Sequence, residues 1–252
     1  MATARRDTLP QAPSKLAMAA ELPRAAWTIG SLAFARAKLM AAPRGDGRPV
    51  LLLPGLFTSD VSNAVLRRYL EALGYRAFGW RLGNNLSLRT IGPGGERLRA
   101  RIAALAEETG EPVTLVGVSL GGVMARFAAQ RWTGLVREVI TVSAPFAGSP
   151  RATNLWRTYQ WLTGERIDSP EAEALLAECA APLPVPATAI WSRSDGFVNG
   201  MICHDPADPA CRNIHIASSH MGVQVKPDVM RAIADVLGGA AEPRMPSRMN
   251  GG

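Results

Sequence analysis

The sequence is poor in the residues that build disulfide-rich and metal-binding proteins. Its 252 residues include only three cysteines and three histidines. Three cysteines exclude a disulfide framework, and Cys179 is expected to be a small buried apolar residue or an unpaired thiol. Cys203 and Cys211 flank a short loop, and the sequence leaves open whether they form a bridge. They lack a second ligand pair at zinc-like spacing, so we expect no metal site.

Aromatic residues and lysines are also scarce. Aromatic residues make up 6% of the chain and are scattered, which argues against a base-stacking platform for nucleic acid. The net charge of +7 comes almost entirely from arginine, because only Lys15, Lys38 and Lys226 are lysines. The arginines form no dense basic run. We therefore interpret the charge mainly as a solvated surface, with a role at a membrane surface as the alternative and no nucleic-acid partner.

The first part of the chain lacks an uninterrupted apolar run. Glu21, Pro23 and Arg24 interrupt the only early candidate for a secretory signal, so no signal peptide is expected and a cytoplasmic location is predicted. Residues 1–45 are expected to form an Ala-rich helical extension. Its residues 14–42 are expected to pack on the main domain, with peripheral contact to a membrane or lipid particle as the alternative.

The rest of the chain predicts one large α/β domain. Hydrophobic residues make up 47% of the sequence, and apolar runs typical of buried strands alternate with helical patterns. This alternation predicts a doubly wound, mostly parallel sheet with helices on both faces and right-handed crossovers. The expected strands are 50–53, 75–80, 112–118, 136–142, 187–191 and 212–216, and the expected helices include 63–73, 94–109 and 223–237.

Residues 151–186 interrupt this alternation. An insertion between two late strands lies at the carboxyl edge of the sheet, where ligands bind, so we expect a small cap or lid. Its aromatic residues either line an acyl pocket or form the core of the cap. The predicted pocket residues are Phe57, Phe146, Trp156 and Trp161.

A G-x-S-x-G pattern lies between the third expected strand and the helix that follows it. Gly117 and Gly121 flank Ser119. This pattern is typical of a serine on a tight strand-to-helix turn, with its hydroxyl above the sheet and its backbone in an uncommon conformation. A Cβ at either glycine would clash with the neighbouring backbone. We predict that Ser119 is a nucleophile.

A nucleophilic serine needs an imidazole as a base. His220 lies in a loop between the last expected strand and the last helix, where it can reach the serine. His204 is the alternative, in a polar loop with no obvious group to orient it. His215 lies within a strand and is expected to be structural.

The histidine in turn needs a carboxylate. Asp195 follows the strand before that of His220, and Asp205 and Asp208 are its competitors. An Asp-Gly dipeptide is also typical of a simple turn. Asp195 gives the chain order nucleophile, acid, histidine, which is that of hydrolases of this α/β type.

The oxyanion of the reaction needs two backbone N–H donors. One is expected to be the amide of Leu120, directly after the nucleophile. The other is expected from the loop after the first strand, at Leu56, with Phe57 as the alternative.

Four motifs together resemble the α/β-hydrolase superfamily, and within it bacterial esterases and triacylglycerol-type lipases. The motifs are Leu53-Pro54-Gly55-Leu56-Phe57, Gly117-Val118-Ser119-Leu120-Gly121, Ser194-Asp195-Gly196 and Ser219-His220-Met221-Gly222. The resemblance covers roughly residues 48–238 and implies ester hydrolysis through an acyl-enzyme, without a cofactor. One departure is Pro54, where many of these lipases have histidine.

A turn-rich hinge near residues 43–49 and a Gly/Pro-rich end of the chain predict a catalytic domain at 46–238, with the cap at 151–186 inside it, and a flexible tail at 239–252. The expected partner is a small-molecule or lipid ester. Polyester depolymerase, thioesterase and acyltransferase activities would use the same triad and remain alternatives. A non-catalytic binding protein of the same fold is the alternative from a different class.

Overall fold

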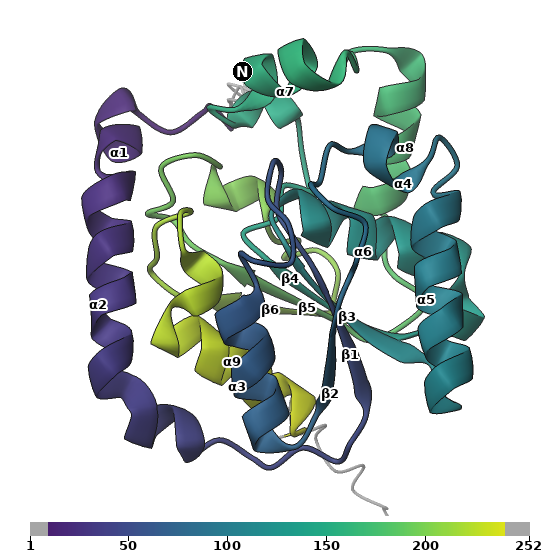
Figure 1. Cartoon of the computed structure of the whole chain (residues 1–252). Coiled ribbons are helices and arrows are strands. Elements are labelled where there is room, and N and C mark those ends of the chain that lie inside the picture. The colour runs from purple at the N-terminus through teal and green to yellow at the C-terminus, as the bar shows by residue number, and fades with distance from the viewer. Residues whose placement is uncertain (1–9, 240–252) are drawn as a thin grey trace, which may run out of the picture.

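The computed structural model describes residues 10–239, and its centre is a six-stranded parallel sheet (Figure 1). The strand order is β2-β1-β3-β4-β5-β6. This confirms the predicted α/β class, and the sheet is parallel throughout. The strands are β1 (Pro49–Leu53), β2 (Arg76–Gly79), β3 (Val113–Val118), β4 (Val136–Val142), β5 (Ala187–Trp191) and β6 (Cys211–His215).

Helices cover both faces of the sheet, as predicted. One face packs against α3 (Ala64–Leu73) and α9 (Pro227–Leu237), and the other against α5 (Glu96–Thr109) and α6 (Leu120–Arg131). The predicted helix 223–237 is divided into a short 3-10 turn, η4 (Val223–Val225), and α9. Pro227 causes the division, because proline lacks an N–H and favours the first position of a helix.

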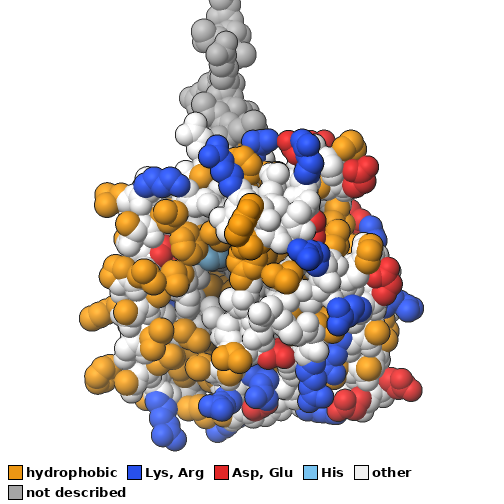
Figure 2. Space-filling model, turned by 45° about the horizontal axis from the view of Figure 1, so that its top comes forward, with side chains coloured by type: hydrophobic (Ala, Val, Ile, Leu, Met, Phe, Trp, Pro, Cys, Tyr) orange, Lys and Arg blue, Asp and Glu red, His pale blue; other side chains and the backbone are white. Residues whose placement is uncertain are grey.

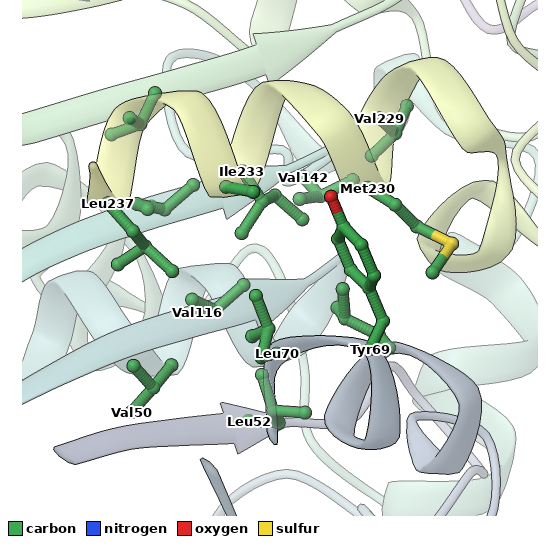
Figure 3. Packing of buried hydrophobic residues seen from close by; sticks show 14 of the residues in the cluster. Val50, Leu52, Tyr69, Leu70, Val116, Val142, Val229, Met230, Ile233 and Leu237 are labelled. Atoms are coloured by element: carbon green, nitrogen blue, oxygen red, sulfur yellow. The ribbon is translucent and has the colours of Figure 1, made fainter. Parts of the chain in front are cut away.

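Two hydrophobic layers hold the sheet between its helices. Consecutive residues of β1 point to opposite layers, so Val50 and Leu52 pack with α3 and α9 while Leu51 and Leu53 pack with α5 and α6. Figure 3 shows the first layer, where Tyr69 of α3 lies between the sheet and α9. Strands buried on both faces explain why the sequence shows continuous apolar runs instead of alternation.

Residues 151–186 leave the sheet between β4 and β5. They form α7 (Trp156–Thr163), which the sequence did not predict, and α8 (Pro170–Ala180). The two helices lie above the carboxyl ends of the strands, with α8 packed on α6 (Figure 1). The loops also contain the short helix α4 (Leu88–Ile91) and three 3-10 turns, η1 (Thr133–Leu135), η2 (Pro150–Ala152) and η3 (Gly200–Ile202).

The N-terminal segment forms α1 (Lys15–Ala19) and α2 (Glu21–Met40), which run along one side of the domain (Figure 1). Helix α2 packs against α9, and the Tyr69 hydroxyl donates to the Leu39 carbonyl at 3.0 Å. Among the described residues, no helix has the length and apolar character needed to cross a membrane. Of the predicted tail 239–252, residues 240–252 lie outside the described range.

The three cysteines are free and buried. Cys203 packs with Trp191 and Ile202, whereas Cys211 belongs to the layer beneath α5 and α6. The bridge that the sequence left open is therefore not formed, because the two side chains lie in different hydrophobic clusters.

Candidate active site

Ser119 lies on the turn between β3 and α6. Its backbone has φ 51° and ψ −121°, a conformation rarely adopted by residues other than glycine. The flanking glycines make this turn possible. A Cβ on Gly117 would lie 2.3 Å from the Gly121 carbonyl oxygen, and one on Gly121 would lie 2.4 Å from the Leu53 carbonyl oxygen. The predicted steric role of both glycines is confirmed.

The structure brings Ser119, His220 and Asp195 together from three separate loops. The Oγ of Ser119 lies 3.1 Å from Nε2 of His220, and Nδ1 of His220 lies 2.6 Å from Oδ2 of Asp195. The side chains of His220 and Asp195 are 10% and 1% exposed, so the chain of hydrogen bonds is almost closed to solvent. A serine, a neutral imidazole and a buried carboxylate in this order can form an activated nucleophile.

Backbone amides fix the orientation of the carboxylate. Oδ1 of Asp195 accepts hydrogen bonds from the amides of Phe197 (2.9 Å) and Val198 (2.8 Å), which leaves Oδ2 for the histidine. Ser192 joins the acid loop to the histidine loop. Its hydroxyl accepts from the Ser218 amide at 2.9 Å and lies 3.0 Å from the Ser218 carbonyl oxygen.

The pKa of His220 is raised above its ordinary value. Burial by itself opposes the shift, because it disfavours the charged imidazolium. The charge and hydrogen bond of Asp195, with a further contribution from the charge of Glu21, outweigh burial and raise the pKa. The surroundings therefore stabilise the cation that forms when the histidine takes a proton.

The two backbone amides predicted to stabilise the oxyanion are those of Leu56 and Leu120. Within residues 10–239, neither the Leu56 nor the Leu120 N–H donates to a protein acceptor. The alternative donor, Phe57, is excluded because its N–H bonds to the Asn85 carbonyl at 2.9 Å. The Asn85 side chain also donates to the Pro54 carbonyl at 2.7 Å and so holds the loop that carries Leu56.

A cavity of about 320 Å³ opens beside Ser119 and extends beneath the cap. Its walls are mainly aliphatic and aromatic. Ser119, Leu56 and Leu120 lie at one end, and α7 and α8 supply much of the remainder. Figure 2 shows a histidine side chain in a hollow on this face, with hydrophobic side chains gathered around it. The cap residues that line the cavity include Leu155, Trp156, Tyr159, Ile167, Ala172, Leu175 and Leu176.

Of the four predicted pocket residues, only Trp156 lines this cavity. Phe146 is wrong as a pocket residue, because it is 1% exposed in the core and stacks beneath the Arg126 guanidinium at 3.9 Å. Trp161 is also wrong, because it points outward from α7 and is 81% exposed. Phe57 is also wrong as a pocket residue, because it is not among the residues that line the cavity.

The remaining histidines have structural contacts. His204 is buried and stacks on Trp191 with 3.8 Å between ring centroids, while its Nδ1 lies 3.1 Å from the Gly200 carbonyl oxygen. His215 lies on the edge strand β6 and packs edge-on against Trp191. Neither lies in the cavity beside Ser119.

Sequence reasoning missed three residues that hold the site. Glu21 is 1% exposed and accepts hydrogen bonds from both triad loops, although the sequence indicated only an interrupted apolar run. Asn85 supports the Leu56 loop, and its only sequence signal is its place in a polar loop. The Tyr159 hydroxyl bonds to Ser87 at 2.8 Å and to Glu165, which ties α7 to the main domain.

Comparison with known proteins identifies the fold. No family model and no curated protein sequence matches this chain. Among solved structures, a metagenome-derived lipolytic enzyme is similar, with a TM-score of 0.56 and 15% identity over 78% of this chain and 95% of that one. A pyrethroid hydrolase from Sphingobium faniae JZ-2 has a TM-score of 0.52 and 19% identity over 78% of this chain and 99% of that one. The lin2722 gene product of Listeria innocua has a TM-score of 0.54 and 14% identity over 76% of this chain and 94% of that one. The chain therefore has the α/β-hydrolase fold.

Proposed function

We propose that the protein is a serine esterase of the carboxylesterase or lipase type. The single observation that carries this proposal is the hydrogen-bonded series Ser119–His220–Asp195 at the mouth of an apolar cavity. The names of similar structures, a lipolytic enzyme and a pyrethroid hydrolase, agree with it, and at their low identity these structures support the fold alone.

In this proposal, Ser119 Oγ attacks the ester carbonyl carbon while Nε2 of His220 takes the hydroxyl proton. The carbonyl oxygen becomes negative and accepts hydrogen bonds from the amides of Leu56 and Leu120. His220 then gives its proton to the leaving alcohol, which leaves an acyl group on Ser119. A water molecule, deprotonated by the same histidine, releases the acid and regenerates the serine.

The cavity favours an ester with an apolar acyl group. About 320 Å³ is at the lower end of small-ligand pockets, and most of the lining side chains are hydrophobic. In the acyl-enzyme, the acyl chain extends from the ester carbonyl carbon that is bonded to Ser119 Oγ. It would run beneath α7 and α8 and remove that lining from water. We therefore expect medium-length acyl esters to be better substrates than acetate.

The test is a series of p-nitrophenyl esters from acetate to palmitate, together with a fluorophosphonate probe. The expected result is hydrolysis with a maximum above acetate and covalent labelling that Ser119→Ala abolishes. As a matched control, Ser143→Ala removes another buried serine with a positive φ, at the end of β4, and should keep both. Absence of hydrolysis across the series, or labelling that persists in Ser119→Ala, would contradict the proposal.

A further inference from the structure

The outer face of α2 is apolar where a surface helix is normally polar. Every exposed residue from Leu22 to Phe34 is apolar or glycine. Leu22, Trp27, Ile29 and Phe34 are 66%, 80%, 58% and 92% exposed. The polar residues Glu21 and Thr28 of the same helix are instead buried against the domain. This reversed pattern indicates that the helix has a second apolar partner outside the described chain.

The charges around this face specify an anionic partner. Residues 15–40 contain the cations Lys15, Arg24, Arg36 and Lys38 and a single acid, Glu21, which is buried. The exposed charged groups of α1 and α2 are therefore all basic. Lys38 forms an ion pair with Asp228 of α9 at 2.5 Å, whereas Arg36, at the C-terminal end of the apolar face, has no acidic partner within residues 10–239. A second copy of the chain docked on this face would bring like charges together, which costs free energy.

We propose that the outer face of α2 is a docking surface for an anionic lipid layer. An amphipathic helix of this kind lies in the plane of a membrane interface, with tryptophan and phenylalanine among the acyl chains and cations at the headgroups. The first turn of α2 lies beside the histidine loop, because Glu21 accepts a hydrogen bond from the Met221 amide at 2.8 Å. Docking therefore brings the lipid surface next to the candidate active site.

Vesicle binding tests this surface without depending on ester hydrolysis. The full chain is mixed with ether-linked phosphatidylcholine vesicles, either pure or with an equal part of ether-linked phosphatidylglycerol, neither of which contains an acyl ester. We expect binding to the anionic vesicles. The double variant Trp27→Ser/Phe34→Ser should weaken it roughly tenfold for each side chain removed. Arg36→Ala should weaken anionic binding by roughly fivefold.

Controls separate this face from other exposed apolar residues. Trp161→Ser removes a tryptophan of the cap with the same exposure, 81% against 80% for Trp27, and should leave vesicle binding unchanged. All variants should keep the circular dichroism of the parent protein, because the altered side chains are exposed. Failure of the parent to bind either vesicle, equal loss in Trp161→Ser, or a dimer that only Trp27→Ser/Phe34→Ser dissociates would overturn the proposal.

On the inner side of α2, one residue contacts both the loop of Asp195 and the loop of His220. One carboxylate, that of Glu21, accepts from the Gly196 amide at 2.7 Å and from the Met221 amide at 2.8 Å. Gly196 directly follows Asp195, and Met221 directly follows His220. Arg24, one turn later, donates to the Ser194 carbonyl at 2.5 Å and lies 3.8 Å from Glu21. The first turn of α2 thus holds the acid loop and the histidine loop at a fixed separation.

We infer that Glu21 is a positioning residue for the pair His220–Asp195. This inference rests on the proposed function for its kinetic effects but not for its structural one. Losing Glu21 leaves the buried Gly196 amide and the partly buried Met221 amide without an acceptor, so we expect the two loops to shift relative to each other. A small displacement between base and acid lowers turnover more than substrate affinity.

The test compares Glu21→Ala and the near-isosteric Glu21→Gln with Glu107→Gln, which removes an exposed carboxylate of α5. We expect kcat to fall by about tenfold to a hundredfold in Glu21→Ala with KM nearly unchanged, and less in Glu21→Gln. Asp195 and Glu21 are the carboxylates that raise the pKa of His220, so Glu21→Gln should move the acidic limb of kcat/KM to lower pH. Glu107→Gln should do neither.

A structural readout makes the inference testable even if the protein cleaves no ester. The Nδ1 proton of His220, which lies between His220 and Asp195, should give a downfield proton NMR signal in the parent protein. That signal should broaden or shift upfield in Glu21→Ala and in Glu21→Gln, and stay unchanged in Glu107→Gln. Folded Glu21 variants with an unchanged signal and an unshifted pH profile would overturn the inference.

Discussion

Replacing Arg126 tests which interactions attach the cap to the main domain. This arginine lies on α6, is 1% exposed, and donates to the carbonyls of Cys179 at 2.5 Å and Ala181 at 2.8 Å. Those carbonyls lie at the C-terminal end of α8, where a cation also interacts favourably with the helix dipole. Its guanidinium additionally stacks 3.9 Å from the centre of the Phe146 ring. The buried arginine therefore joins the cap to the main domain.

Replacement by methionine keeps the volume of the side chain and removes these interactions. Each hydrogen bond from a charged donor contributes about 1.5–3 kcal/mol, and the carbonyl of Cys179 would be left buried without a donor. Allowing for the desolvation cost that methionine avoids, we expect the free energy of unfolding to fall by about 3–5 kcal/mol. For a chain of this size, that corresponds to a decrease in Tm of about 10 °C.

A second arginine on the same helix serves as the control. Arg131 forms an ion pair with Glu178 of α8 at 2.7 Å, but its side chain is 41% exposed. Solvent screens such a pair, so Arg131→Met should cost at most about 1 kcal/mol. Urea unfolding followed by circular dichroism measures both variants, and hydrogen exchange of α8 shows whether the loss is local. A loss below about 1 kcal/mol in Arg126→Met, or equal losses in the two variants, would refute this reasoning.

Three further predictions follow from the site. The kcat/KM of the parent should fall as pH drops through a pKa above about 6.5, because His220 must be neutral to act as a base and its pKa is raised. A decrease in kcat/KM that begins only below pH 6.5 would contradict the assigned charges. Gly121→Ala should give little folded protein on expression, since its Cβ would meet the Leu53 carbonyl oxygen at 2.4 Å; a stable, active variant would show that the turn relaxes. Cys179 should resist iodoacetamide at pH 8 in the native protein and react in the unfolded protein, because burial raises the pKa of its thiol to about 12. Rapid labelling of the native protein would be inconsistent with close packing of α8 on α6.

The sequence predicted best those features that depend on neighbouring residues. Strands β1, β3 and β5 are short, largely apolar runs followed by a loop with glycine, proline or serine, and burial on both faces makes these runs continuous. Ser119 was identified from its flanking glycines, which the tight turn requires. Asp195 and His220 were then found because the carboxyl ends of parallel strands meet at one edge of the sheet.

The features that were missed depend on contacts between distant parts of the chain. Glu21 seemed only to interrupt an apolar run, because its two partners lie 175 and 200 residues further along the chain. Phe146 and Trp161 are both aromatic residues near the cap, and only the three-dimensional packing decides that one is buried under Arg126 and the other faces solvent. Local pattern carries no information on either choice.

The loops of the sheet and the cap contribute different parts of the candidate site, so the cap can be replaced separately. Every triad side chain stands on a loop at the carboxyl end of a strand, whereas α7 and α8 contribute cavity wall and no triad member. On the proposed function, exchanging the cap helices, residues 156–180, for another insertion should alter which acyl groups fit. Residues 152–154 would have to be kept, because they hydrogen-bond to the loop of Asp195. Such a graft must supply carbonyl acceptors for Arg126, or the transplanted cap would leave a buried cation unpaired. If the proposed function holds, the cap would set the substrate range and the loops of the sheet would carry out bond cleavage.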